Sequence, residues 1–222
     1  MDVGANIRYF RSLLPPDVEL VAVSKFHPAE MILEAYNAGQ KTFGESRVKE
    51  FLEKREVLPS DIRWHFIGHL QTNKVRPIIG KTYLIESVDS EKLLELIEAE
   101  STKAGVITNV LLQVHVAEEE TKFGFYPEEI VKLLNSDKIK SLKSTRIKGL
   151  MGMATNTDEE TRIRKDFSVL HNLFLEIKKN PTFCLPDFKY LSMGMSGDWK
   201  IAVSEGSNII RIGSSIFGER TY

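Results

Sequence analysis

Eight short apolar runs recur along the chain, and the stretches between them carry helical patterns. Most runs are β-branched or aromatic, and several are apolar on successive residues, which is typical of strands buried on both faces of a parallel sheet. This repetition favours an α/β fold, a single closed (β/α)₈ TIM barrel, over an open doubly wound sheet. The expected strands are Glu19–Lys25, Lys41–Glu45, Arg63–Gly68, Tyr83–Ser87, Asn109–Val116, Arg146–Ala154, Lys189–Met195 and Ile209–Gly213.

Helical patterns lie between these runs and before the first of them. Pro28–Gly39 opens with Pro and closes with Gly, the usual asymmetry of helix ends. The segment from Asp89 and the segment Thr157–Lys178 begin with capping residues and continue with apolar positions at helical spacing, as Ser196–Gly206 also does. Val3–Leu14 predicts an extra N-terminal helix. Without a linker or low-complexity tract, residues 1–222 are expected to form one domain.

Composition excludes several classes of partner. The formal net charge is −1, which gives no electrostatic footprint for nucleic acid or an anionic membrane. The N-terminus lacks the pattern of a signal peptide, and no apolar run reaches the roughly 18 residues of a membrane span. The single cysteine, Cys184, fits a reducing compartment and is interpreted as a small apolar filler. We therefore expect a soluble, cytoplasmic protein.

Two cationic residues stand at the carboxyl ends of strands, where barrels of this kind place their active sites. Lys25 follows an apolar strand, and desolvation of its amine would favour Schiff-base chemistry; the alternative is a lysine that reaches solvent. Arg211 lies inside a buried strand and must find an acceptor. That acceptor is either a carboxylate, with Glu45 and Glu86 as candidates, or an aromatic ring nitrogen of a ligand.

Small polar residues follow the last two strands, the common phosphate-binding ends of such barrels. Gly213 and Ser214 come after the eighth strand, and Ser196 after the seventh, where we expect it to cap a helix. Asp198 argues mildly against an anion there, and ordinary turn chemistry is the alternative interpretation. The five histidines show no metal-ligand spacing, so we expect no metal site.

An ordered set of motifs spans nearly the whole chain and resembles the YggS/PROSC family of pyridoxal phosphate homeostasis proteins. The matching segments are Ala22-Val-Ser-Lys25, Phe43-Gly-Glu45, Trp64-His-Phe-Ile-Gly68, Leu70-Gln-Thr-Asn-Lys74, Lys122-Phe-Gly124, Gly149-Leu-Met151, Leu191-Ser-Met-Gly-Met-Ser196 and Arg211-Ile-Gly-Ser-Ser-Ile-Phe-Gly218. The resemblance implies a barrel similar to the N-terminal domain of alanine racemase that binds pyridoxal 5′-phosphate.

The resemblance also implies roles for individual residues. Lys25 would form a Schiff base with the cofactor, Arg211 would face its pyridine nitrogen, and Ser196, Gly213 and Ser214 would hold the phosphate. Met151, at the end of the sixth strand, completes the expected cofactor-binding set.

Two departures from the family pattern concern the rim of the barrel. Ser46 stands where the family often has Asn, and His69 where it often has Pro. The first leaves open whether position 46 contacts the cofactor. Lys74 and Lys122 are candidate amines near the mouth, with solvated surface lysine as the alternative.

The expected function is storage, protection or delivery of the cofactor, with apoenzymes as possible recipients. Arginine stays protonated and so leaves the pyridine unprotonated, a poorer electron sink than the Asp of most such enzymes provides. Alanine racemase uses a tyrosine from a second domain as a further base, and we expect no second domain here. The sequence does not decide whether the chain is an enzyme; a racemase-like amino-acid enzyme and a Schiff-base aldolase on phosphorylated sugars are the alternatives.

Overall fold

The computed structural model describes residues 2–119, 123–183, 185 and 187–219. Two residues discussed above, Lys122 and Cys184, lie outside this part of the chain. The strands are β1 (Glu19–Val23), β2 (Thr42–Glu45), β3 (Arg63–Phe66), β4 (Leu84–Val88), β5 (Thr108–Val114), β6 (Thr145–Gly152), β7 (Tyr190–Ser192) and β8 (Ile209–Ile212). The α-helices are α1 (Val3–Leu13), α2 (Ala29–Asn37), α3 (Val48–Val57), α4 (Glu91–Ala104), α5 (Pro127–Leu134), α6 (Asp137–Ser141), α7 (Glu160–Lys179), α8 (Trp199–Ser204) and α9 (Ser214–Phe217). Short 3₁₀ helices are η1 (Thr72–Lys74), η2 (Arg76–Ile78) and η3 (Pro181–Phe183).

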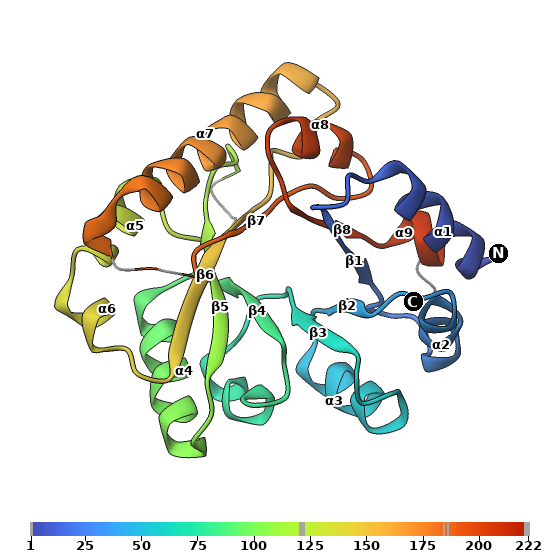
Figure 1. Cartoon of the computed structure of the whole chain (residues 1–222), viewed down its shortest axis with the longest axis horizontal. Coiled ribbons are helices and arrows are strands. Elements are labelled where there is room, and N and C mark those ends of the chain that lie inside the picture. Colours follow the sequence, from blue (N-terminus) through green and yellow to red (C-terminus); the bar gives the residue numbers. More distant parts are fainter. Residues whose placement is uncertain (1, 120–122, 184, 186, 220–222) are drawn as a thin grey trace.

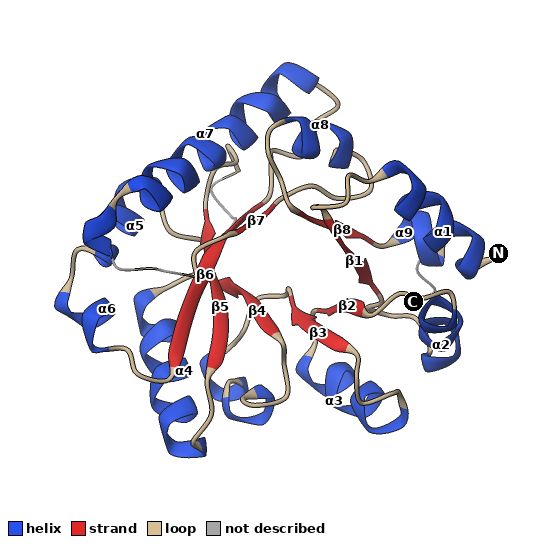
Figure 2. Ribbon diagram, in the orientation of Figure 1, coloured by secondary structure: helices blue, strands red, loops and turns tan. Residues whose placement is uncertain are grey.

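The eight strands form one closed parallel barrel in sequence order, which confirms the predicted (β/α)₈ architecture. β1 closes the ring against β8, and Val21 is the register partner of Arg211. The helices lie outside this ring (Figures 1 and 2). The predicted N-terminal helix is α1, which lies beside α9, and the side-chain amide of Asn6 donates to the Ile216 carbonyl at 2.9 Å.

Side chains of the strands alternate between two buried layers. A small cluster fills the barrel interior, and a much larger core lies between the strands and the helices. Val21 belongs to the interior cluster, whereas its neighbour Ala22 belongs to the outer core. The interior cluster consists of Val21, Leu84, Leu111, Met151 and Ile209, with Tyr190 packed against it. Because apolar layers cover both faces, several strands, such as β1 and β8, are apolar on successive residues.

The helix after β7 begins later than predicted. Asp198, not Ser196, is the residue before the first turn of α8, which starts at Trp199. The Asp198 carboxylate accepts a hydrogen bond from the Met195 amide at 2.5 Å and so closes the loop after β7. The expectation that Ser196 caps this helix is therefore wrong: the loop keeps Ser196 outside the helix.

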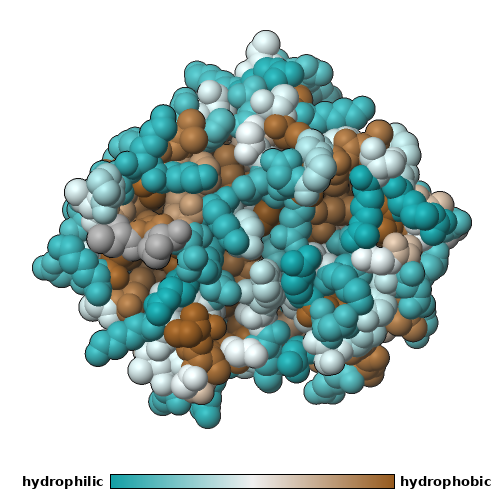
Figure 3. Space-filling model, viewed as in Figure 1, coloured by the Kyte–Doolittle hydropathy of each residue, from teal (hydrophilic) through white to brown (hydrophobic). Residues whose placement is uncertain are grey.

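The face of the molecule seen in Figure 3 is mostly hydrophilic, with separate hydrophobic patches. Among the helices of the described residues, none combines the length and the apolar character that a membrane span requires.

Candidate functional site

Arg211 is buried in the barrel interior, with 4% of its surface exposed. Its Nη1 donates to Ser192 Oγ at 2.5 Å, and its Nη2 donates to the Gly152 carbonyl at 3.0 Å. Nη1 also lies 3.7 Å from Glu86 Oε2. Of the two carboxylates that the sequence offered, the structure thus pairs Arg211 with Glu86. Glu45 as its partner was wrong, because Glu45 belongs to a different network.

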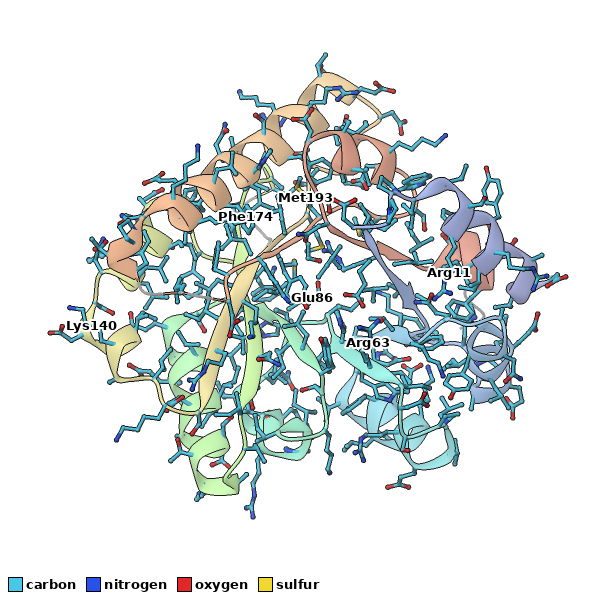
Figure 4. The ribbon with its side chains drawn as sticks, viewed as in Figure 1. Arg11, Arg63, Glu86, Lys140, Phe174 and Met193 are labelled. Carbon is cyan, nitrogen blue, oxygen red and sulfur yellow. The ribbon has the colours of Figure 1, made fainter. Side chains whose placement is uncertain are left out.

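Glu86 connects Arg211 to the amino-terminal half of the barrel and lies near the centre of the ring of strands (Figure 4). Its Oε2 accepts from Ser192 Oγ at 2.5 Å, and its Oε1 lies 2.6 Å from His65 Nδ1. Burial alone would raise the pKa of Glu86, but the hydrogen bond and charge of His65, the charge of Arg211 and the Ser192 hydroxyl together lower it. Glu86 is therefore an anion that compensates the buried guanidinium. Burial lowers the pKa of Arg211, against the opposing charges of Glu86 and Asp198.

Lys25 lies two residues beyond the end of β1, in a tight turn at the carboxyl end of the barrel, and is half-buried. The amide of His27 closes this turn by donating to the Ser24 carbonyl at 3.1 Å. Phe26 has φ +69°, the left-handed region that residues other than glycine rarely adopt. Since β1 and β8 are neighbours, this turn and the strand of Arg211 share one side of the barrel.

A buried ionic network lies behind the turn, between the barrel and helix α3. The Lys54 ammonium donates to Glu45 Oε1 at 2.7 Å, to Glu50 Oε1 at 2.6 Å and to the Ser24 carbonyl at 2.8 Å. Ser24 Oγ also donates to Glu45 Oε1, at 2.7 Å. Burial raises the pKa of Glu45 to about 7, although the charge and hydrogen bond of Lys54 and the Ser24 hydroxyl oppose the shift. The sequence analysis did not predict this network. The one sign of it in the sequence was Glu45, a carboxylate at the end of a buried strand, which requires a cation or a hydrogen-bond donor nearby.

The predicted phosphate residues gather at the ends of β7 and β8. Ser196 Oγ and Ser214 Oγ lie 3.4 Å apart, and Ser214 is exposed. Gly213 lies beside β1, where a Cβ at this position would be in van der Waals contact with Val23, 3.4 Å from its Cβ. A Cβ on Gly197 would meet no atom within 4 Å, so open space adjoins the two hydroxyls. The structure therefore brings Ser196, Gly213 and Ser214 together, next to the strand that leads to Lys25.

The remaining sequence candidates lie at different depths. Met151 is buried in the barrel interior, and its register partner on β7 is Ser192, which bonds to Arg211. Ser46 is half-buried in the loop after β2, where its backbone packs against Gly68. Lys74 is exposed in η1, as the surface alternative predicted. No cluster of metal-ligating side chains occurs among the residues that the structure describes.

His69 makes a contact at the rim that the sequence did not predict. Its ring stacks on Phe123 from the loop after β5, with the ring centroids 4.0 Å apart. Its Nδ1 lies 2.7 Å from Asp89 Oδ2. The residue that departs from the family pattern thus bridges the loops after β3, β4 and β5.

Known proteins resemble this chain over nearly its full length. The family model for the N-terminal domain of alanine racemase matches residues 2–221. A pyridoxal phosphate homeostasis protein of Aquifex aeolicus is 41% identical over 92% of this chain and 88% of its own length. The human protein of that name is 38% identical over 91% of this chain and 77% of its own length.

Solved structures agree with these sequence matches. PipY of Synechococcus elongatus, solved with PLP bound, superposes with a TM-score of 0.87 at 35% identity and covers 97% of this chain and all of its own. The alanine racemase of E. faecalis has a TM-score of 0.78 at 20% identity over 98% of this chain and 58% of its own, which shows a shared fold alone. The chain belongs to the alanine racemase N-terminal domain family and, within it, to the pyridoxal phosphate homeostasis proteins.

Proposed function

We propose that this protein binds pyridoxal 5′-phosphate through a Schiff base on Lys25 and stores, protects or delivers the cofactor. The relatives named for pyridoxal phosphate homeostasis and the PLP-bound PipY structure support the proposal. We propose that residues 1–222 form a single barrel domain. We place it in the cytoplasm, since the low cysteine content fits a reducing compartment.

The observation that carries the proposal is that an amine, a guanidinium and two hydroxyls belong to three adjacent strands, β7, β8 and β1, or to the turns that follow them. Lys25 follows β1, Arg211 lies on β8, and Ser196 and Ser214 follow β7 and β8. Their chemistry fits three of the polar groups of the cofactor: its aldehyde, its ring nitrogen and its phosphate.

Each residue has a distinct task in this arrangement. Lys25 would hold the aldehyde group of the cofactor covalently through its side-chain nitrogen, with release of one water molecule. Arg211, whose Nη1 and Nη2 donate to Ser192 and Gly152, would face the ring nitrogen as a hydrogen-bond donor. Ser196, Gly213 and Ser214 hold the phosphate, and Met151 provides an apolar floor.

The charge balance of the site supports a carrier. Arg211 is held as a cation by the anionic Glu86, so it donates a hydrogen bond and leaves the ring nitrogen without a proton. A bound cofactor of this kind is a weak electron sink, although it remains exchangeable with other amines. Apoenzymes that need the cofactor are the proposed recipients. The competing role, an amino-acid racemase, predicts steady turnover of chiral amino acids.

Absorbance and chemical trapping test the proposal. Wild-type protein incubated with pyridoxal 5′-phosphate should give an imine absorbance band, and borohydride should fix one cofactor per chain on Lys25, as located by peptide mass. Lys25→Ala should lose both results, whereas Lys74→Ala, a change at an exposed lysine, should keep them. A wild-type protein without the band contradicts binding, and rapid racemisation of amino acids contradicts the carrier role.

A further inference from the structure

Both neighbours of Lys25 in the sequence are bound by side chains of helix α3. On one side, the Lys54 ammonium donates to the carbonyl of Ser24 at 2.8 Å. On the other side, the amide of Phe26 donates to Glu50 Oε1 at 2.5 Å. The backbone of Lys25 is thus held before and after its own Cα by a helix that contributes none of the residues proposed to bind the cofactor.

These two side chains are themselves fixed. Lys54 is 6% exposed, and the three contacts of its Nζ, to Ser24, Glu45 and Glu50, match the three hydrogens of an ammonium group. Glu50 is one helical turn before Lys54 and accepts from both Lys54 and Phe26 through the same oxygen. Charged groups held by several hydrogen bonds resist movement, since any movement breaks several charge-assisted hydrogen bonds at once.

The turn needs such support because its backbone is strained. Phe26 occupies the left-handed region, which disfavours residues that have a Cβ. The hydrogen bond from the Phe26 amide to Glu50 stabilises this conformation, because the bond requires the amide to point toward α3. Arg47 adds a contact over the Phe26 ring, 4.4 Å from its centroid.

We propose that Glu50 and Lys54 are positioning residues for Lys25. They hold the 24–27 turn in its left-handed form and thereby set the place from which the Lys25 amine meets the aldehyde. They act through the backbone and do not touch the reacting atoms. This inference rests on the proposed function, because it assigns the residues that support its Schiff-base step.

Two ligands distinguish a loss of Lys25 positioning from a general loss of the pocket. Pyridoxal 5′-phosphate needs a placed amine, whereas pyridoxine 5′-phosphate carries the same ring and phosphate with an alcohol that cannot form an imine. For Glu50→Ala we expect the equilibrium constant for borohydride-trappable adduct to fall by about tenfold, the loss of one hydrogen bond to a charged group. The affinity for pyridoxine 5′-phosphate, measured by calorimetry, should change by less than about twofold.

Three further variants complete the design. Glu50→Gln keeps an oxygen that can accept from the Phe26 amide, so it should restore most of the adduct and remains informative if Glu50→Ala fails to fold. Lys54→Met, which removes the bond to Ser24, should lower adduct formation as Glu50→Ala does. Glu53→Ala is the matched control, since Glu53 lies on the same helix and its ion pair is with the exposed Lys49, at 3.8 Å.

The outcomes are distinct. Adduct formation at the wild-type level in Glu50→Ala and Lys54→Met overturns the positioning role, and so does an equal loss for both ligands, which indicates a general collapse of the pocket. Wild-type protein that binds pyridoxine 5′-phosphate but gives no trappable adduct overturns the Schiff base itself and the positioning role with it. Selective loss of the aldehyde ligand's adduct, with recovery in Glu50→Gln, supports the inference.

Discussion

At the scale of single residues, the carboxyl group of Glu45 shows how burial changes chemistry behind the site. Glu45 is fully buried between β2 and α3. Its Oε1 accepts from Lys54 and Ser24, whereas Oε2 has no hydrogen-bond partner among the described residues. An oxygen left unpaired in a dry environment disfavours the anion, and the nearby Glu50 disfavours it further. The pKa of Glu45 is accordingly raised from 4.5 to about 7.

This shift predicts a pH dependence of stability. The folded protein binds the Glu45 proton more tightly than the unfolded chain, so the contribution is fully present below about pH 4.5 and is lost as pH rises through about 7. Relative to Glu45→Gln, which cannot titrate, the free energy of unfolding of the wild type should fall by about 3 kcal/mol between pH 4.5 and 8. Urea unfolding of both proteins across this range measures the difference, and a constant difference would contradict the raised pKa.

The individual site residues differ in how far the sequence could predict them. Lys25 and Arg211 could be predicted as site residues because a cation at the end of a buried strand or within it needs an acceptor or a ligand. The choice between Glu45 and Glu86 as the partner of Arg211 was not visible, because it depends on which residues the barrel brings into its interior. Lys54 was missed, since in Val48–Val57 charged residues outnumber apolar ones and the segment reads as a solvated helix.

At the scale of elements, the pairing of β6 with β7 depends on a glycine. Gly149 is the register partner of Tyr190, and a Cβ at position 149 would lie 1.8 Å from the Tyr190 carbonyl oxygen. Backbone atoms on both sides leave no flexible group that could move aside. β7 has only three residues, and it carries Ser192 and leads to Ser196. The place of both serines therefore depends on the absence of a side chain at Gly149.

Substitution of this glycine should be far more costly than substitution of one with open surroundings. Gly149→Ala must push β7 away from β6, and we expect a loss of about 3 kcal/mol or more in the free energy of unfolding. Gly105→Ala is the control: Gly105 has φ +66° at the end of α4 but no atom near its Cβ, so only about 1 kcal/mol of backbone strain is expected. Chemical denaturation compares the two variants, and equal losses would show that the close contact with Tyr190 is relieved without cost.

The elements themselves were largely predictable, and the errors have local causes. All eight strands were found because strands between two apolar layers leave a continuous apolar run in the sequence. The start of α8 was misplaced because Ser196 and Asp198 are both good capping residues, and only the fold shows that Asp198 takes that place.

At the scale of the whole molecule, the barrel closes where its first and last strands meet. β1 and β8 come from opposite ends of the chain, and their pairing brings the turn of Lys25 next to the strand of Arg211. Eight strand–helix repeats predict this closure, and closure in sequence order makes the first and last strands neighbours. The adjacency of the turn of Lys25 and the strand of Arg211 therefore followed from the number of repeats, whereas the contacts of Arg211 did not.

A ligand that bonds to both closing strands should stabilise the whole fold. Binding to the folded state alone adds RT ln(1 + [L]/Kd), about 2.7 kcal/mol at a hundredfold excess over Kd. For a chain of this length, that corresponds to a rise in Tm of roughly 5–10 °C with pyridoxal 5′-phosphate.

Lys25→Ala keeps Arg211 and the phosphate residues but loses the bond to β1, so its rise in Tm at the same ligand concentration should be clearly smaller. Calorimetric scans of both proteins, with pyridoxine 5′-phosphate as the ligand that cannot form an imine, test this. If the ligand raised the Tm of Lys25→Ala as much as that of the wild type, the cofactor would not be bonded to the turn after β1. The ligand would then not stabilise the fold by joining β1 to β8.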